Sequence, residues 1–139
     1  MKILTELKLN GKGFLDDEFY IQQFEKTINN DINDTQLIYR ISGDFRGIGK
    51  TKVLNDFSFL LQSIYTDRFN RIIWVTPYTM QEYIGTDVYS PEIFSRVGMQ
   101  CVDCKSIILF DGIDVFSDIF NEICRYLEGR HIPIVGFGY

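Results

Sequence analysis

The stretch LIYRISGDFRGIGKT, residues 37–51, decides the fold of this chain. Its apolar beginning, residues 37–42, predicts a strand, and the rest is a glycine-rich turn that ends in Gly-Lys-Thr. Apolar side chains then recur at helical spacing, which predicts a helix as far as about Tyr65. A strand, a glycine turn, Lys-Thr and a helix in this order form the context that a phosphate-binding loop requires.

In such a loop, successive backbone N–H groups and the helix N-terminus point at an anion, the lysine reaches the outer phosphates and the threonine hydroxyl ligates Mg²⁺. The spacing departs from the common pattern G-x-x-x-x-G-K-S/T, because Asp44 stands at the first glycine position and Gly43 lies one residue early. Either the turn holds an extra residue, or the Asp44 carboxylate lies where phosphates would bind. The alternative is a plain strand-to-helix turn with an exposed lysine. The candidate nucleotide-binding residues are Gly43, Asp44, Arg46, Gly47, Ile48, Gly49, Lys50 and Thr51.

A second apolar run, residues 106–111, ends in a carboxylate. Its sequence SIILFD is typical of a buried parallel strand. Asp111 stands where a nucleotide site needs a carboxylate to hold Mg²⁺, directly or through water. Ligands in parallel sheets bind at the carboxyl ends of the strands, so Asp111 is expected at the same edge as Lys50 and Thr51. Without that turn, an aspartate at this position would serve as a helix cap or lie in a solvated turn.

Hydrolysis also needs a group that orients the attacking water. In many ATPases a glutamate follows the metal-binding aspartate, but Gly112 follows it here. Asp114 is the nearest substitute, and the alternative role for Asp114 is to cap the helix expected after it. Lys50 and Asp114 are therefore the candidate catalytic residues, Thr51 and Asp111 are the candidate metal ligands, and ATP binding is better supported than ATP turnover.

The remaining chain alternates between expected helices and strands. Residues 2–9 can form a strand or a short helix, a helix is expected from Asp16 or Asp17 to about Ile28, and strands are expected over residues 71–77 and 131–136. Two short helices are expected over residues 78–84 and 91–97, and a longer one that ends at Gly129 has an apolar face of Phe116, Ile119, Phe120, Ile123 and Leu127.

This alternation predicts an α/β fold of three layers, a parallel sheet with helices on both faces. It predicts one domain over residues 1–139, with an N-terminal extension (1–36) and a core (37–139). Hydrophobic residues make up 45% of the 139 residues, enough for one buried core. The net charge of −5 disfavours indiscriminate coating of DNA, because phosphate contacts need clustered Lys and Arg.

The sequence also bears on location. The N-terminus lacks the apolar core of a signal peptide, and no apolar run has the length of a membrane span. Three cysteines form no disulfide framework, so the expected location is a reducing cytoplasm. Zinc binding is less favoured than free cysteines, because the spacings match no common finger among the possible ligands Cys101, Cys104, Cys124 and His131.

These motifs resemble those of P-loop ATPases of the AAA+ and related classes, in which a further strand separates the phosphate-loop strand from the strand of the metal-binding (Walker B) aspartate. The glycine turn together with DGID, residues 111–114, looks like the NACHT-type signalling ATPases. IWVTP at residues 73–77, and RY at 125–126 before IPIV at 132–135, look like bacterial and phage helicase loaders. The resemblance spans about residues 37–136, and its specific positions are Gly47, Gly49, Lys50, Thr51 and Asp111.

The resemblance implies a cytoplasmic protein that binds ATP and Mg²⁺, an assembly or DNA-replication and processing factor similar to helicase loaders, with weak intrinsic hydrolysis. The family's polar sensor, fifth strand, arginine finger and helical lid have no counterpart in this sequence. The strand before the glycine turn would then lie at a sheet edge, and we expect residues 2–9 or a partner protein to cover it. A protein partner or a homo-oligomer is expected and a membrane is not. Nucleic acid is less favoured, because few Arg or Lys accompany the aromatic residues.

The rival interpretation is a catalytically inactive protein of the P-loop fold that binds a partner protein. Asp44 in the turn and Gly112 in the glutamate position both favour it. A small nucleotide kinase is a weaker alternative, because no arginine-rich lid follows the core.

Overall fold

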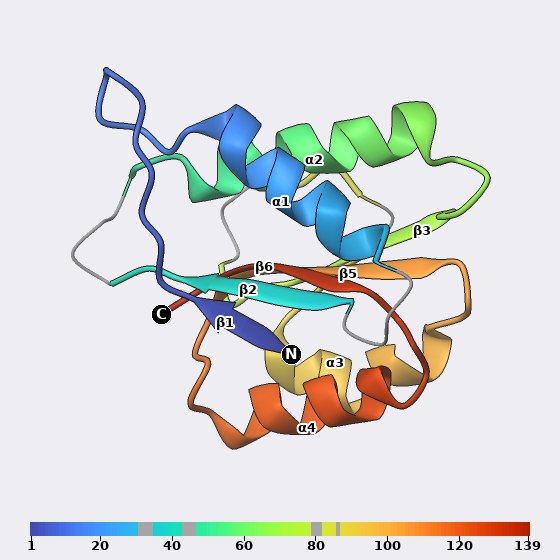
Figure 1. The fold of residues 1–139 in the computed structure, drawn as a ribbon. Helices are drawn as coiled ribbons and strands as arrows, with labels where there is room; N and C mark the ends of the chain where they lie inside the picture. The colour runs from blue at the N-terminus through green and yellow to red at the C-terminus, as the bar shows by residue number, and fades with distance from the viewer. Residues whose placement is uncertain (31–34, 43–46, 79–81, 86) are drawn as a thin grey trace.

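A single parallel sheet forms the centre of the chain, as seen in a computed structural model that describes residues 1–30, 35–42, 47–78, 82–85 and 87–139. Its strands are β1 (Lys2–Leu4), β2 (Gln36–Arg40), β3 (Arg71–Val75), β4 (Asp87–Tyr89), β5 (Ser106–Ile113) and β6 (Ile134–Gly138). Among the described residues they form a six-stranded sheet in the order β1-β2-β6-β5-β3-β4, and every neighbouring pair is parallel (Figure 1).

Helices cover both faces of this sheet (Figure 1). One face carries α1 (Asp17–Ile28) and α2 (Lys50–Ile64), and the other carries α3 (Pro91–Arg96), the 3-10 turn η1 (Gly98–Cys101) and α4 (Asp118–Glu128). The expected three-layer α/β architecture with a parallel sheet is therefore confirmed.

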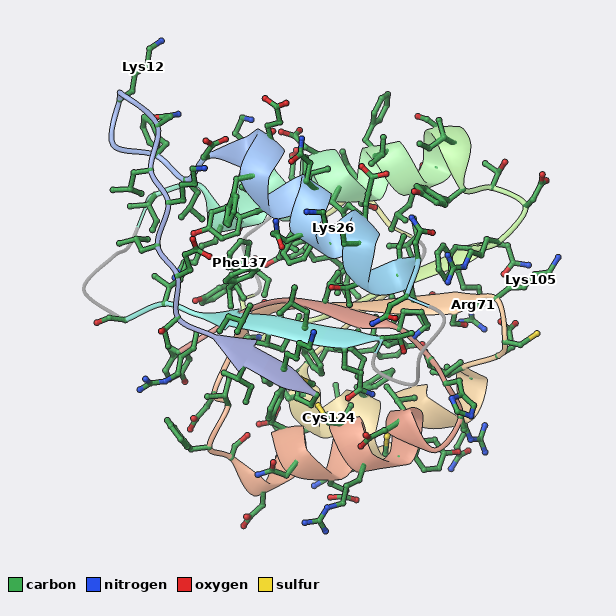
Figure 2. The ribbon with its side chains drawn as sticks, viewed as in Figure 1. Lys12, Lys26, Arg71, Lys105, Cys124 and Phe137 are labelled. Atoms are coloured by element: carbon green, nitrogen blue, oxygen red, sulfur yellow. The ribbon has the colours of Figure 1, made fainter. Side chains whose placement is uncertain are left out.

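Successive strand residues point to opposite faces, so each central strand contributes to both cores. In β6, Val135 and Phe137 belong to the core under α1 and α2, whereas Ile134 belongs to the core under α3 and α4. Figure 2 shows Phe137 on the α1 side of the sheet and Cys124 on the α4 side. The strands read as continuous apolar runs because both of their faces are buried.

The edge of β2 is covered by β1. Lys2 pairs with Leu37 and Leu4 pairs with Tyr39, in parallel. This confirms that the N-terminal segment can cover the edge, although only residues 2–4 of the expected 2–9 form the strand. The segment that follows also reaches the glycine turn, because the Leu15 amide donates a 2.8 Å hydrogen bond to the Ile48 carbonyl.

The helix expected over residues 78–84 is not found among the residues of that segment that are described. Instead, the side chain of Asn55 in α2 binds the backbone, donating to the Glu82 carbonyl (2.9 Å) and accepting from the Ile84 amide (2.7 Å). These bonds use main-chain groups that a helix would need. The chain then enters β4, a strand that the sequence did not predict.

The segment from β5 to β6 also differs from the expectation. Asp111 does not end its strand, because β5 continues to Ile113 through an irregularity in its pairing with β6.

The start of α4 differs as well. The Ser117 hydroxyl accepts from the Phe120 amide (3.2 Å) and caps α4, so Asp114 is not the cap. Phe116 precedes the helix and is 72% exposed instead of buried. The last strand begins only at Ile134, because residues 129–132 form the turn that leaves α4.

We expect Gly136→Ala to destabilise the protein by about 3 kcal/mol or more, because a large loss follows from a steric conflict in a central strand. A Cβ at this position would lie 2.0 Å from the Phe110 carbonyl oxygen, and the Gly136 φ of 156° is unfavourable for a side chain. Urea unfolding measures the change.

Gly11→Ala is the matched control, since a Cβ there would have no atom within 4 Å, and its cost should stay within about 0.5 kcal/mol. Equal stability of the two variants would contradict the close approach of β6 to β5.

Candidate functional site

Residues 47–49 form the turn that leads into α2, and Lys50 and Thr51 are the first residues of the helix. Gly47 and Gly49 have φ values of 69° and 94°, in the left-handed region that favours glycine. Gly49 is the N-cap of α2, and its carbonyl accepts from the Val53 amide at 3.0 Å. A glycine cap has no side chain to accept hydrogen bonds from the first amides of the helix. The helix therefore begins in the way that suits an anion at its N-terminus.

Thr51 and Asp111, which are 60 positions apart in the sequence, meet at this end of the sheet. The Thr51 hydroxyl donates a hydrogen bond of 2.6 Å to Oδ2 of Asp111. Asp111 is 1% exposed, and its second oxygen, Oδ1, is buried without a hydrogen-bond partner among the described residues. Buried polar atoms nearly always have a partner, so this oxygen is suited to a ligand, an ion or a water.

Burial raises the pKa of the Asp111 carboxyl above its ordinary value. Hydrogen bonds from Thr51 and Tyr83 and the positive charge of Lys50 act in the opposite direction and lower this pKa. Lys50 is therefore close enough to Asp111 for their charges to interact. The carboxylate is held in a poorly solvated place where a further positive charge would stabilise its ionised form.

The sequence did not identify two further residues of this site, Tyr83 and Thr76. The Tyr83 hydroxyl lies 3.2 Å from Oδ2 of Asp111 and 3.2 Å from Oγ1 of Thr76. Thr76 follows β3, the neighbour of β5, so a polar residue at the carboxyl end of that strand was the available signal. Tyr83 had no such signal, because it lies in the segment where a helix was expected.

Gly112 occupies the position that carries a glutamate in many ATPases. Its φ is 77°, and a Cβ at this position would lie 2.5 Å from the ring of Tyr78. A side chain at Gly112 would therefore be strained and would displace that ring. Asp114, the candidate for orienting water, lies in the turn before α4, where its Oδ1 accepts from the Phe116 amide at 3.0 Å.

Of the predicted nucleotide-binding residues, the structure describes only the second part of the turn. Thr51 contacts Asp111 and Lys50 lies near it. Gly47, Ile48 and Gly49 lead into the first turn of α2. The other three lie outside the described residues: Gly43, Asp44 and Arg46.

Within the described parts of the chain, no three His, Cys, Asp or Glu side chains gather as a metal-binding group. The two cysteines of the Cys-x-x-Cys pair, Cys101 and Cys104, are exposed, whereas Cys124 is buried on α4. The four-ligand zinc set is therefore not assembled.

Mg²⁺ needs fewer protein ligands than zinc, because it is commonly held by one or two carboxylates together with water and substrate phosphates. Oxygen is the ligand atom that this cation takes, and Thr51 and Asp111 offer a hydroxyl and a carboxylate side by side. The partnerless Oδ1 of Asp111 is the observation that fits a cation at this place. Thr51 and Asp111 are therefore the described residues whose oxygen atoms fit a Mg²⁺ ion.

Compared with known protein families, with curated proteins and with solved structures, the chain gives no significant match. None of the described helices combines the length and the apolar character that crossing a membrane demands.

In the metal-free protein, Asp111→Asn should raise Tm relative to the wild type, and the difference should grow as the pH rises above the ordinary aspartate pKa of 3.8. The raised pKa means that, above the ordinary value of 3.8, native Asp111 holds its proton when the unfolded chain has lost it. The contribution of Asp111 to stability is therefore greatest at low pH and falls as the pH rises towards the native pKa. Asparagine does not ionise, so the variant escapes this loss.

Thermal unfolding of both proteins across this pH range is the measurement, and the other carboxyl groups cancel in the difference. A Tm difference that stays constant with pH would show that Asp111 is not ionised at a cost in the native state.

Proposed function

We propose that this chain is a P-loop ATPase-like protein that binds ATP with Mg²⁺ at residues 47–51. The observation that carries the proposal is the 2.6 Å contact between the hydroxyl of Thr51 and the buried carboxylate of Asp111. It joins the residue after the lysine of the glycine turn to an aspartate on another strand. Burying a carboxylate carries a desolvation cost, which a bound cation would offset together with the hydrogen bonds that Asp111 already accepts.

The order of the strands supports the same proposal. The strand before the turn, β2, and the strand of Asp111, β5, are separated by β6. The resemblance to AAA+ and related ATPases implies one strand between these two. In this proposal Lys50 and the amides of the turn hold the phosphates, and Thr51 and Asp111 hold Mg²⁺, which supplies charge neutralisation to the phosphate oxygens when bound.

Hydrolysis by the chain alone is expected to be slow. The glutamate position is Gly112, where the left-handed backbone and the ring of Tyr78 leave no room for a side chain. Asp114 is the remaining candidate for orienting water. The proposed role is that of an assembly or DNA-replication and processing factor similar to helicase loaders, which works with a protein partner.

The second candidate function is that of an inactive interaction protein that keeps the fold and has lost the nucleotide. The glycine at position 112 favours it, because the position lacks the glutamate that most directly serves hydrolysis and a Cβ there would lie 2.5 Å from the Tyr78 ring. The two candidates differ in nucleotide binding, which the next experiment measures.

ATP with Mg²⁺ should raise Tm by several degrees, because a ligand at about 100 times its Kd stabilises the native state by about 2.7 kcal/mol. Lys50→Ala should abolish most of this shift, since it removes the charge that contacts the outer phosphates. Lys105→Ala is the control: it removes the same charge immediately before β5, at the opposite end of the sheet (Figure 2), and should leave the shift intact.

No shift in the wild-type protein, confirmed by calorimetry, would leave the inactive interaction protein as the better candidate. An equal loss in both lysine variants would indicate a nonspecific effect of charge.

We further expect ATP turnover by the purified chain below about 1 per second, the low end of ordinary enzyme rates. Asp114→Asn should reduce the residual rate further without changing the ATP·Mg²⁺ affinity, because its proposed role concerns water and not the nucleotide. A phosphate-release assay measures the rate. An unchanged rate in the variant would remove Asp114 from the proposed mechanism.

A further inference from the structure

The hydroxyl of Tyr83 links two side chains at the carboxyl end of the sheet. It donates to Oδ2 of Asp111 at 3.2 Å and lies 3.2 Å from Oγ1 of Thr76. Because the Tyr83 hydroxyl uses its hydrogen in the bond to Asp111, it accepts the hydrogen bond from the Thr76 hydroxyl. Oγ1 of Thr76 in turn accepts from the Tyr78 amide at 3.1 Å, so the hydroxyl of Thr76 also has a fixed orientation.

The ring of Tyr83 is held from the side of the sheet. It packs against Trp74 of β3 with the ring centroids 4.5 Å apart and the planes at 43°. The indole Nε1 of Trp74 donates to the carbonyl of the next residue, Ile84, at 2.9 Å. Because Trp74 is fully buried, both contacts rest on a rigid side chain.

The same segment is also tied to α2, the helix that begins with Lys50 and Thr51. Asn55, one turn after Thr51, binds the backbone of Glu82 and Ile84, and the hydroxyl of Ser58 donates to the Ile84 carbonyl. The position of Tyr83 is therefore set by the helix that carries Thr51. The hydroxyl of Thr51 in this helix and the hydroxyl of Tyr83 both donate to Oδ2 of Asp111.

We infer that Tyr83 is a positioning residue of the metal–nucleotide site. It holds the Asp111 carboxylate in the orientation that keeps Oδ2 on Thr51 and leaves Oδ1 for the cation. This inference rests on the proposed function, since it assigns a role to Tyr83 at that same site.

The physical reason is the freedom of a carboxylate to turn. The terminal torsion of aspartate is broad and nearly two-fold, so one hydrogen bond from Thr51 leaves the plane of the carboxylate poorly defined. A second donor on the same oxygen fixes that plane. Hydrogen bonds that orient a ligating carboxylate typically change metal affinity by about 10- to 100-fold when removed.

Packing alone is the competing explanation, because the Tyr83 ring fills space beside Trp74. The two explanations separate in Tyr83→Phe, which keeps the ring and removes only the hydroxyl, and in Tyr83→Leu, which removes both. A packing role would be preserved in the phenylalanine variant, and a positioning role would be lost in both.

The test is calorimetric titration of the full chain with ATP, once with Mg²⁺ and once with EDTA. In Tyr83→Phe the Kd for ATP with Mg²⁺ should rise about ten-fold, while the Kd in EDTA should stay at the wild-type value. The matched control is Tyr65→Phe at the other end of α2, which also removes a hydroxyl bonded to a carboxylate, that of Glu25 at 2.8 Å. It should change neither constant.

A wild-type response to Mg²⁺ in Tyr83→Phe would overturn the inference and leave the proposed function standing, as would equal weakening with Mg²⁺ and with EDTA. A wild-type chain that binds no ATP under either condition would overturn both. The result that supports the inference is a rise of about ten-fold or more in the Kd for ATP with Mg²⁺ in both Tyr83 variants, with the EDTA value of Tyr83→Phe and both constants of Tyr65→Phe unchanged.

Discussion

The carboxylate of Asp111 is buried at the end of a sheet, and the arrangement around it follows from the cost of placing it there. A carboxylate removed from water must be compensated by hydrogen bonds or by positive charge. Here Thr51 and Tyr83 supply the hydrogen bonds and Lys50 supplies the charge. All three residues lie outside β5, the strand that carries Asp111. This balance connects the start of α2, the segment before β4 and the Asp111 strand into one site.

The parallel sheet is what allows these segments to meet. Because all pairs of strands run the same way, the residues that follow β2, β3 and β5 emerge at one edge. β6 is the single strand between β2 and β5, and Gly136 lets it lie close to Phe110. A side chain there would clash with the backbone of β5 one residue before Asp111.

Much of the architecture could be predicted from the sequence, because buried parallel strands such as residues 106–111 are uninterrupted apolar runs. The meeting of Thr51 and Asp111 also followed from the rule that ligands gather at the carboxyl ends of such strands. Tyr83 could not be found in this way. Its place depends on Asn55 binding backbone groups 27 and 29 positions away, a contact with no local pattern. The continuation of β5 past Asp111 depends in the same way on pairing with β6.

The position of β6 has a consequence for how the sheet assembles during folding. Without β6, the sheet consists of two separate parts, β1 with β2 and β5 with β3 and β4. Residues 134–138 follow the other described strands along the chain, yet they lie between these two parts of the sheet. Until β6 joins them, the two parts have unpaired sheet edges, at which strands of neighbouring chains can associate. β6 thus joins the part of the sheet that leads to Thr51 with the part that carries Asp111.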